Sequence, residues 1–360
     1  MRVLRRWIVT EVLRGTAVVT AVFAALFLFF DFVDQLEDIG RGAYGLKEAL
    51  FYVVLRLPSR LYELLPIALL VGALGALAQM ARHSELAVLR ASGLSVTGLW
   101  RILAWAAAVL AVLIFAVGEW LVPPAEQMAR MFRGQAMGES DISTGDLRSG
   151  VWIREGNDFI NVRRFSSDGQ LRELEIYRFG SDQTLTAIDR VAAAQFDAAR
   201  ETWRLKEVQR RRFTAERIVA EAVPELEWRT ELTPEVLAVL MVEPYRMTIR
   251  ALSTFSQHLM RNGQNADRYL LALGRKLVYP FTAFVMVTLA LPFALGHARG
   301  APIGFKVFLG TLLGVAFHLL NSLSGSLGVL AGWSPWLAAL LPGAAFMLLA
   351  LAMMHWVERR

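Results

Sequence analysis

The chain has 360 residues, of which 55% are hydrophobic and 19% are charged, and its formal net charge is +6. Soluble domains of this size are about 45–50% apolar, and the apolar residues here come in long blocks, which excludes an ordinary soluble domain. The chain contains no cysteine, which excludes disulfides, thiolate metal sites and cysteine nucleophiles.

Six apolar windows are long enough to cross a membrane. A hydrocarbon core of about 30 Å needs about 20 apolar residues of helix. The windows cover about residues 15–33, 61–81, 102–122, 277–297, 303–324 and 336–356. The first is too long for the core of a cleavable signal peptide and predicts a signal anchor. The sequence therefore predicts a six-span helical membrane protein.

The distribution of Lys and Arg among the short loops predicts the orientation. With the N-terminus inside, the cytoplasmic side receives Arg2, Arg5, Arg6, Arg14, Arg82, Arg90, Arg101, Arg299, Lys306, Arg359 and Arg360. The short outer loops receive Arg41, Lys47, Arg56 and Arg60, mixed with acidic residues. Both termini are therefore predicted to be cytoplasmic, and topology explains the positive charge better than nucleic-acid binding does.

A short polar segment, "HSELAVLRASGLS" (83–95), joins the second and third windows on the cytoplasmic side. Ser84 is expected to cap the start of a helix and Gly93 to end it. Two interpretations stay open. The helix is either an interfacial connector in which Glu85 pairs with Arg82, or a coupling helix that docks on a cytoplasmic partner.

An extramembrane region of about 123–267 separates the first three windows from the last three, and the orientation makes it periplasmic. It begins and ends with helical patterns. Between them come short β-rich runs separated by turn residues, "GVWIREGNDFINVRRF", "SDGQLRELEIYRF", "TLTAIDRVAAAQFD", "ETWRLKEVQRRRF" and "ELEWRTEL". Repeated short strands of this kind predict a small β sandwich or jelly roll.

The outer half of the first window is unusually aromatic, with Phe23, Phe27 and Phe30. These side chains either contact lipid and neighbouring helices or form the wall of an apolar cavity. Asp31 and Asp34 follow one turn apart, so we expect them to share a face at the outer membrane edge.

Two arginines, Arg130 and Arg133, lie at i and i+3 on the helix that leaves the third window. Guanidinium groups on one helix face suit bidentate phosphate binding. A solvated helix face or a lipid headgroup anchor is an equally open interpretation.

The fifth window carries Gly304, Gly310 and Gly314, with His318 and Asn321 at depth. Small residues permit close helix approach, and polar groups within a bilayer usually face protein or a wet cavity. The window either lines a gate or lumen or simply packs against other spans.

An active site within this chain is poorly supported. The sequence has no G-x-x-x-x-G-K-[ST] phosphate loop, no H-E-x-x-H and no G-x-S-x-G. The five histidines are dispersed without metal-ligand spacing. If the protein performs work driven by ATP, a cytoplasmic partner must hydrolyse it.

Several stretches along the chain carry a resemblance to a known family. They are "FVDQL", "SEL" with "ASG", "GEW", "EQMAR" with "QAM", "DRYLLALGRKLVYP" and "ALLPGAAF". In this order they resemble the lipopolysaccharide export permeases of the LptF/LptG family, and the G-type subunit more than the F-type. The resemblance covers nearly the whole chain.

The resemblance implies an architecture. Residues 1–122 would form three spans with a coupling helix at 83–93, residues 123–267 a periplasmic β jelly roll with flanking helices, and residues 268–360 three further spans. It also implies a multi-pass protein of the bacterial inner membrane. The alternatives are the paired F-type subunit, a polytopic scaffold that displays a periplasmic β domain, or a lipid-modifying intramembrane enzyme.

The resemblance further implies a transport role and partners. The chain would extract lipopolysaccharide from the outer leaflet and pass it to a periplasmic bridge. The implied partners are an F-type permease subunit, a cytoplasmic ABC ATPase dimer, a bitopic LptC-like jelly-roll protein and a periplasmic LptA-like bridge. No cofactor or metal is expected in this chain, because ATP and Mg²⁺ would bind to the ATPase.

Candidate site residues follow from the same resemblance. The ATPase-coupling candidates are Glu85, Leu86, Leu89 and Arg90, and the headgroup candidates are Arg130, Arg133 and Arg41. The candidates for acyl chains and a lateral gate are Phe27, Phe30, Asp34, Phe317 and Leu320. The sequence departs from the family at the outer end of the first span, because related proteins often have lysines where it has Asp31, Glu37 and Asp38.

Overall fold

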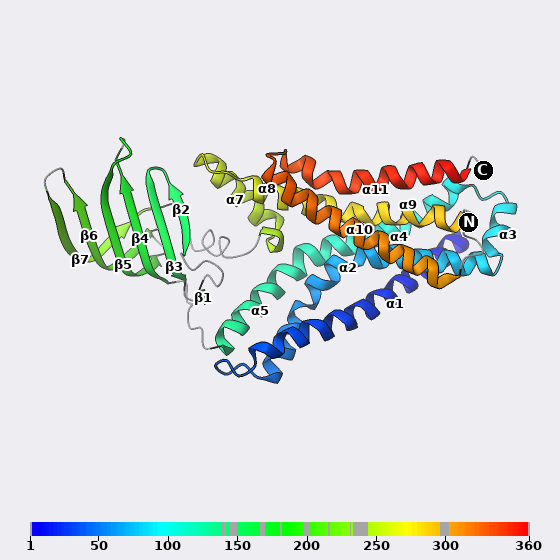
Figure 1. The fold of residues 1–360 in the computed structure, drawn as a ribbon, viewed down its shortest axis with the longest axis horizontal. Coiled ribbons are helices and arrows are strands. Elements are labelled where there is room, and N and C mark those ends of the chain that lie inside the picture. Colours follow the sequence, from blue (N-terminus) through cyan, green and yellow to red (C-terminus); the bar gives the residue numbers. More distant parts are fainter. Residues whose placement is uncertain are drawn as a thin grey trace. The chain divides into compact units, whose positions relative to one another are not determined.

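The computed structural model describes residues 2–137, 142–143, 150–165, 170–180, 182–197, 200, 202–214, 217–230, 232, 244–295 and 302–358. These residues group into two compact units (Figure 1). The helical unit comprises Met1–Glu37, Val53–Glu126 and Asp267–Arg360. The sheet unit comprises Asp38–Tyr52 and Gln127–Ala266.

The described chain contains 6 helical segments long and apolar enough to cross a membrane, which confirms the predicted spans. The helices are α1 (Arg2–Gln35), α2 (Leu46–Arg82), α3 (Glu85–Ala91), α4 (Val96–Ala116), α5 (Val122–Ala136), α7 (Ile249–Arg261), α8 (Asp267–Val278), α9 (Thr282–Leu295), α10 (Ile303–Leu330) and α11 (Pro335–Glu358). Short turns η1 (Leu36–Asp38), η3 (Pro244–Arg246) and η4 (Tyr279–Phe281) and a π-helical turn η2 (Val117–Leu121) complete them.

The helix α2 begins well before the apolar window that predicted it, at Leu46 rather than near residue 61. The added turns carry Lys47, Glu48, Arg56 and Arg60, and such charges end an apolar window. They do not end a helix, because charged side chains have good helix propensity. The apolar window therefore marks only the part of α2 that is apolar enough for the hydrocarbon core of a membrane, and the helix itself is longer.

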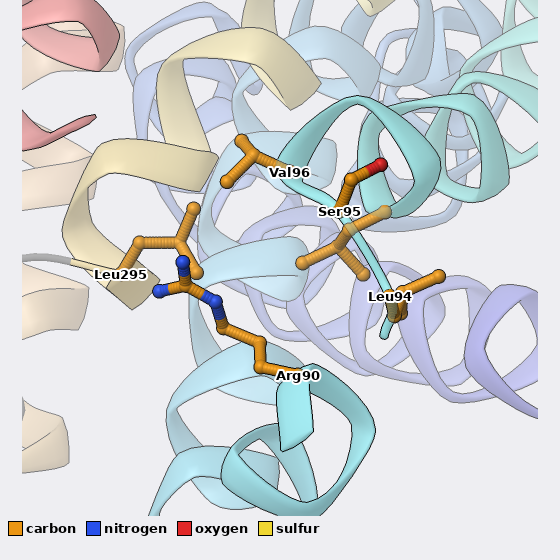
Figure 2. A pocket seen from close by; sticks show the side chains of 6 residues that line it. Arg90, Leu94, Ser95, Val96 and Leu295 are labelled. Atoms are coloured by element: carbon orange, nitrogen blue, oxygen red, sulfur yellow. The ribbon is translucent and has the colours of Figure 1, made fainter. Parts of the chain in front are cut away.

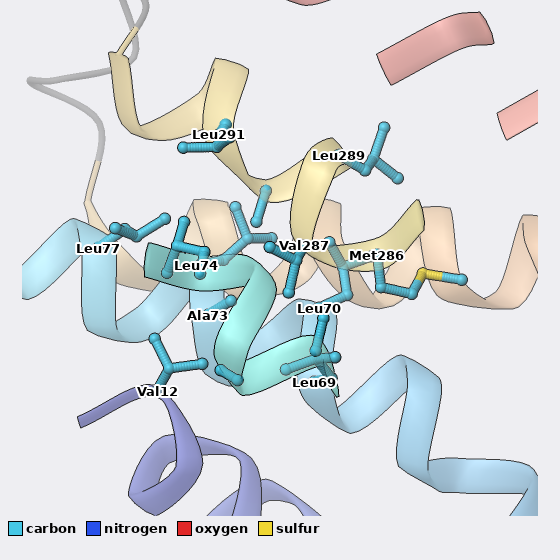
Figure 3. Packing of buried hydrophobic residues seen from close by; sticks show 14 of the residues in the cluster. Val12, Leu69, Leu70, Ala73, Leu74, Leu77, Met286, Val287, Leu289 and Leu291 are labelled. Atoms are coloured by element: carbon cyan, nitrogen blue, oxygen red, sulfur yellow. The ribbon is translucent and has the colours of Figure 1, made fainter. Parts of the chain in front are cut away.

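One apolar cluster holds the helical unit together. In Figure 3, Leu70 and Leu74 of α2 lie beside Val287 of α9 in this cluster. In its apolar window α2 is 78% buried, whereas α1 is 11% buried. The helix α2 is therefore central, and α1 leaves most of its apolar surface for lipid or another protein.

The sheet unit contains one antiparallel sheet with the strand order β1-β3-β4-β5-β6-β7 and with β2 paired to β3. The strands are β1 (Ile142–Ser143), β2 (Val151–Glu155), β3 (Asp158–Phe165), β4 (Leu171–Phe179), β5 (Leu185–Asp197), β6 (Thr202–Phe213) and β7 (Ile218–Trp228). The predicted fold class, membrane helices with an inserted β domain, is confirmed.

Two residues with left-handed backbone interrupt the alternation of polar and apolar side chains in these strands. Glu173 and Glu207 have positive φ angles of 54°, and the strand pairing passes over both of them and over Ala192 between them without a shift in register. The buried positions change phase there, since Leu171 and Leu174 are both buried although they are three positions apart. The inner face still closes on a buried apolar cluster, which includes Ile160, Trp203 and Leu205.

One carboxylate is fully buried on the inner face of the sheet. The side chain of Asp189 accepts hydrogen bonds from Arg210 Nε at 2.7 Å and from Arg178 Nε at 3.1 Å. Burial alone would raise the pKa of Asp189, but the hydrogen bonds from Arg210 and the charges of both arginines lower it below its ordinary value. The two arginines thus stabilise the ionised form of the Asp189 carboxylate.

We expect Asp189→Asn to destabilise the protein at pH 7 by about 1–3 kcal/mol, the usual cost of leaving a buried polar group unsatisfied. A carboxylate with a lowered pKa stabilises the fold above its unfolded pKa of about 3.9, and this contribution is lost as the pH falls through the lowered value. The melting temperatures of wild type and variant should therefore differ at pH 7 and converge only as the pH falls below the lowered pKa of Asp189.

The matched control is Glu227→Gln, which removes a carboxylate from the exposed pair with Arg200. Exposed pairs contribute about 0–1 kcal/mol, so this variant should melt close to wild type. An Asp189→Asn variant that melts like Glu227→Gln at pH 7 would show that the buried pair contributes nothing.

Candidate functional site

The helix α3 is attached to the helical unit by its leucines. Leu86 is 3% exposed and belongs to the apolar cluster, and Leu89 packs against that cluster. Both residues were predicted as contacts for a partner. In this structure they hold α3 against the bundle instead, because an amphipathic two-turn helix places its apolar side inward.

The start of α3 differs from the prediction and its end agrees with it. Ser84 has a φ of 62° and its side chain makes no capping hydrogen bond, so the predicted N-cap is wrong. Gly93 has a φ of 93°, and the backbone N–H of Leu94 donates to the carbonyl of Leu89. This left-handed glycine ends the helix as predicted.

The outward side of α3 carries Val88, which is 66% exposed, and the exposed Arg90. Glu85 is half-buried and forms no ion pair with Arg82 in the described part of the chain. Figure 2 shows that Arg90 lines a shallow pocket, whose other lining residues are Leu94, Ser95, Val96, Leu99 and Leu295. Sequence reasoning missed Val88, although its spacing from Leu86 places it off the buried side.

Two of the three headgroup candidates meet on one carboxylate. Arg41 Nη1 lies 2.7 Å from Asp38 Oδ1, and the Arg133 guanidinium bonds to the other carboxylate oxygen. The Arg133 guanidinium also lies over the ring of Tyr52, 5.3 Å from the centroid. The third candidate, Arg130, is half-buried one turn before Arg133.

The two acidic residues near the end of α1, Asp31 and Asp34, differ in exposure. Asp31 is 6% exposed and accepts two hydrogen bonds from Arg60, from Nε at 2.8 Å and from Nη2 at 2.5 Å. Asp34 is exposed. The prediction that both share one face is therefore wrong, because Asp31 is a buried contact between α1 and α2, whereas their place at the outer membrane edge stays a prediction.

The candidates for acyl-chain contact do not form one surface in this chain. Phe30 is 54% exposed, whereas Phe27 is half-buried beneath the Arg60 guanidinium. Phe317 is 4% exposed and makes an edge-on contact with Phe346, with ring centroids 5.2 Å apart. Leu320 is half-buried and packs against the core.

The fifth span packs on α2 through its glycines. A Cβ on Gly310 would lie 2.5 Å from Leu74 Cδ1, and one on Gly314 would lie 2.6 Å from Ile67 Cγ2. This supports close packing by these two residues. His318 is exposed in this chain, so it does not pack in the core of the helical unit, and the interpretation that the span lines a gate or lumen stays a prediction.

Sequence reasoning missed the charged contacts that join the spans. Lys276 Nζ of α8 lies 3.0 Å from Glu119 Oε2 in the π-helical turn η2. Ser59 of α2 donates to Glu126 of α5, with 2.5 Å between the oxygens. The signal was available, because ionisable residues inside spans are expensive and usually pair.

No group of His, Cys, Asp and Glu suitable for a metal ion occurs among the residues that the structure describes. The candidate site is thus a set of ionic and apolar contacts in two places. One place is the outward side of α3, which was predicted to be cytoplasmic, and the other is the cluster around Asp38, which was predicted to lie at the outer membrane surface and is called the outer site below. Neither part has the arrangement of a nucleophile and a base.

Comparison with known proteins matches residues 6–356 to the family model of the lipopolysaccharide export system permease LptF/LptG. The chain is 34% identical over 345 residues to the lipopolysaccharide export system permease protein LptG of Escherichia coli (strain K12), which covers 94% of this chain and 95% of that one. It is 29% identical over 352 residues to the LptG protein of Haemophilus influenzae, covering 96% and 97%. The predicted resemblance is confirmed, and the chain belongs to the LptF/LptG family of lipopolysaccharide export permeases.

Proposed function

We propose that this chain is the G-type permease of an ATP-driven exporter that extracts lipopolysaccharide from the outer leaflet of the inner membrane. As a member of the permease family it is a multi-pass inner-membrane transport subunit rather than an enzyme. In the proposal both termini are cytoplasmic and the sheet unit is periplasmic. An ABC ATPase dimer binds ATP and Mg²⁺ below the membrane.

The observation that carries the proposal is the way α3 is built. Its apolar side is fixed in the core of the helical unit through Leu86, while Val88 and Arg90 remain exposed. A helix joined rigidly to two spans transmits a push from below to the bundle. The sequence has no phosphate loop of its own, so the push must come from a separate ATPase.

Two parts of the chain besides α3, the exposed side of α1 and the β sheet, are assigned to the proposed partners. The exposed apolar surface of α1 leaves room for an F-type permease. In the proposal the β sheet passes the lipid to an LptC-like protein and then to an LptA-like bridge. A continuous apolar route would avoid the cost of exposing acyl chains to water, which is about 0.8 kcal/mol per CH₂.

We expect Glu85→Ala to uncouple ATP hydrolysis from lipid transfer. Removing a charge from an interface costs about 2–5 kcal/mol when its partner charge is left buried and unpaired, so coupled transfer should fall at least about tenfold. The measurement is lipid-stimulated ATPase activity and lipopolysaccharide transfer in the same proteoliposomes, which contain the ATPase and both permeases.

The matched control is Glu11→Ala, which removes an acidic side chain from the cytoplasmic half of α1. It should leave both activities near the wild-type level. If Glu85→Ala also leaves both unchanged, Glu85 is not the coupling contact. If the wild-type complex transfers no lipopolysaccharide, the exporter proposal itself fails.

A further inference from the structure

An aspartate occupies the place at the outer site where a phosphate would be expected to bind. The Asp38 carboxylate bonds to Arg41 through one oxygen and to Arg133 through the other. Arginine pairs bind carboxylate and phosphate through the same planar arrangement of N–H donors. An internal carboxylate on two arginines therefore mimics a bound phosphate ester.

The exposure of these groups allows an anion to replace the carboxylate. The side chain of Asp38 is 14% exposed, whereas those of Arg133 and Arg41 are 34% and 70% exposed. The arginines thus remain accessible from outside while they hold Asp38. One carboxylate also leaves one of the two positive charges unbalanced, since two arginines carry +2 and Asp38 carries −1.

The Arg133 side chain and the turn that carries Arg41 have contacts besides those with the Asp38 side chain. Arg133 is also held by the ring of Tyr52. The turn that carries Arg41 is fastened to the end of α5, because the backbone N–H of Ala43 donates to the carbonyl of Ala136 at 2.7 Å. Gly42 lies so close that an added Cβ would be 2.5 Å from the Met137 carbonyl oxygen. The Arg133 side chain and the backbone turn of Arg41 can therefore keep their positions when the Asp38 side chain moves away.

We propose that Asp38 is an exchangeable counterion, which leaves Arg41 and Arg133 when the phosphate group of a membrane lipid binds and returns when the lipid departs. The inference rests on the proposed headgroup role of the arginines and adds a means of release. Two arginines without a competing carboxylate would hold a phosphate tightly, and a transporter must let its cargo go. Asp38 lowers the affinity and thereby speeds release.

The test compares Asp38→Asn with wild type in nanodiscs that contain the full chain and its permease partner. The probes are lipid A with both phosphates, the same lipid with its phosphates removed, and phosphatidylglycerol. Asp38→Asn should bind phosphorylated lipid A about tenfold more tightly, equivalent to about 1.4 kcal/mol, and dephosphorylated lipid A unchanged. In proteoliposomes that also contain the ATPase, ATP-driven transfer of the phosphorylated lipid should become slower. Tighter phosphatidylglycerol binding would identify any lipid phosphate as the exchanging anion, and a lack of it would identify the lipid A headgroup.

Two further variants separate exchange from a structural role. Glu37→Gln removes the same charge from the exposed neighbouring position and should not change the preference for phosphate. Asp38→Glu retains the carboxylate and should bind near the wild-type level. If Asp38→Asn weakens the binding of both lipids and lowers the melting temperature, Asp38 is a structural tie and the inference is wrong.

A failure of the proposed function would look different. If wild type and Arg133→Gln bind phosphorylated and dephosphorylated lipid A equally well, the arginines do not bind the headgroup at all. If phosphate matters in wild type but Asp38→Asn changes neither affinity nor transfer, only the exchange is wrong.

Discussion

Gly72→Ala is expected to destabilise the protein by about 2–3 kcal/mol, in the upper range for inserting a methyl group into a packed interior. A Cβ at this position would lie 2.4 Å from the backbone nitrogen of Thr16 and 2.8 Å from the carbonyl carbon of Gly15. Both contacts are with backbone, so no side chain can rotate out of the way. The helices α1 and α2 must separate instead, and close approach at small residues is what holds spans together in a membrane.

The same helix provides the control, because a Cβ on Gly75 would have no atom within 4 Å. Alanine is preferred over glycine in a helix by about 1 kcal/mol, so Gly75→Ala should be neutral or stabilising. The measurement is the melting temperature of the full chain in detergent micelles. Equal melting temperatures for the two variants would contradict the close packing at Gly72.

Structural features that depend on residues close together in the sequence could be predicted. The six spans follow from blocks of apolar residues, and the β domain follows from short runs between turns. Gly93 ends α3 as predicted, because a glycine with a positive φ angle stops a helix locally and needs no distant contact. The start of α3 was predicted wrongly, since Ser84 takes a left-handed conformation of its own and its side chain cannot reach the helix.

The candidate site depended on contacts that sequence spacing does not show. Arg133 was singled out from its spacing to Arg130, but its carboxylate partner lies 95 positions away in the chain. Asp31 has its partner 29 positions away. Leu86 was predicted from the family resemblance to contact a partner ATPase. Only the packing shows that the core of this chain already buries it.

The buried pair of Asp31 and Arg60 should be among the strongest contacts between α1 and α2. The carboxylate side chain is 8% exposed and the arginine is 28% exposed. Arg60→Met would leave the Asp31 carboxylate in an apolar surrounding without a counterion, and we expect a loss of about 3–5 kcal/mol. Asp31→Asn should cost less, because Arg60 keeps Glu63 within 3.8 Å and the Phe27 ring at 5.5 Å.

The double variant Asp31→Leu with Arg60→Met tests whether the two side chains act as a pair. Replacing both members of a buried ion pair by apolar residues is often neutral or stabilising. The double variant should therefore melt well above Arg60→Met alone, and the double-mutant cycle should give a coupling energy of about 1–3 kcal/mol.

Arg14→Met is the matched control for the chemical change, since Arg14 is 75% exposed and lies 3.9 Å from Glu11. Such an exposed pair contributes about 0–1 kcal/mol, so this variant should melt close to wild type. Additive losses in the double variant would mean that Asp31 and Arg60 stabilise the protein separately. A coupled result would mean that this chain uses Asp31 to fasten α1 to α2.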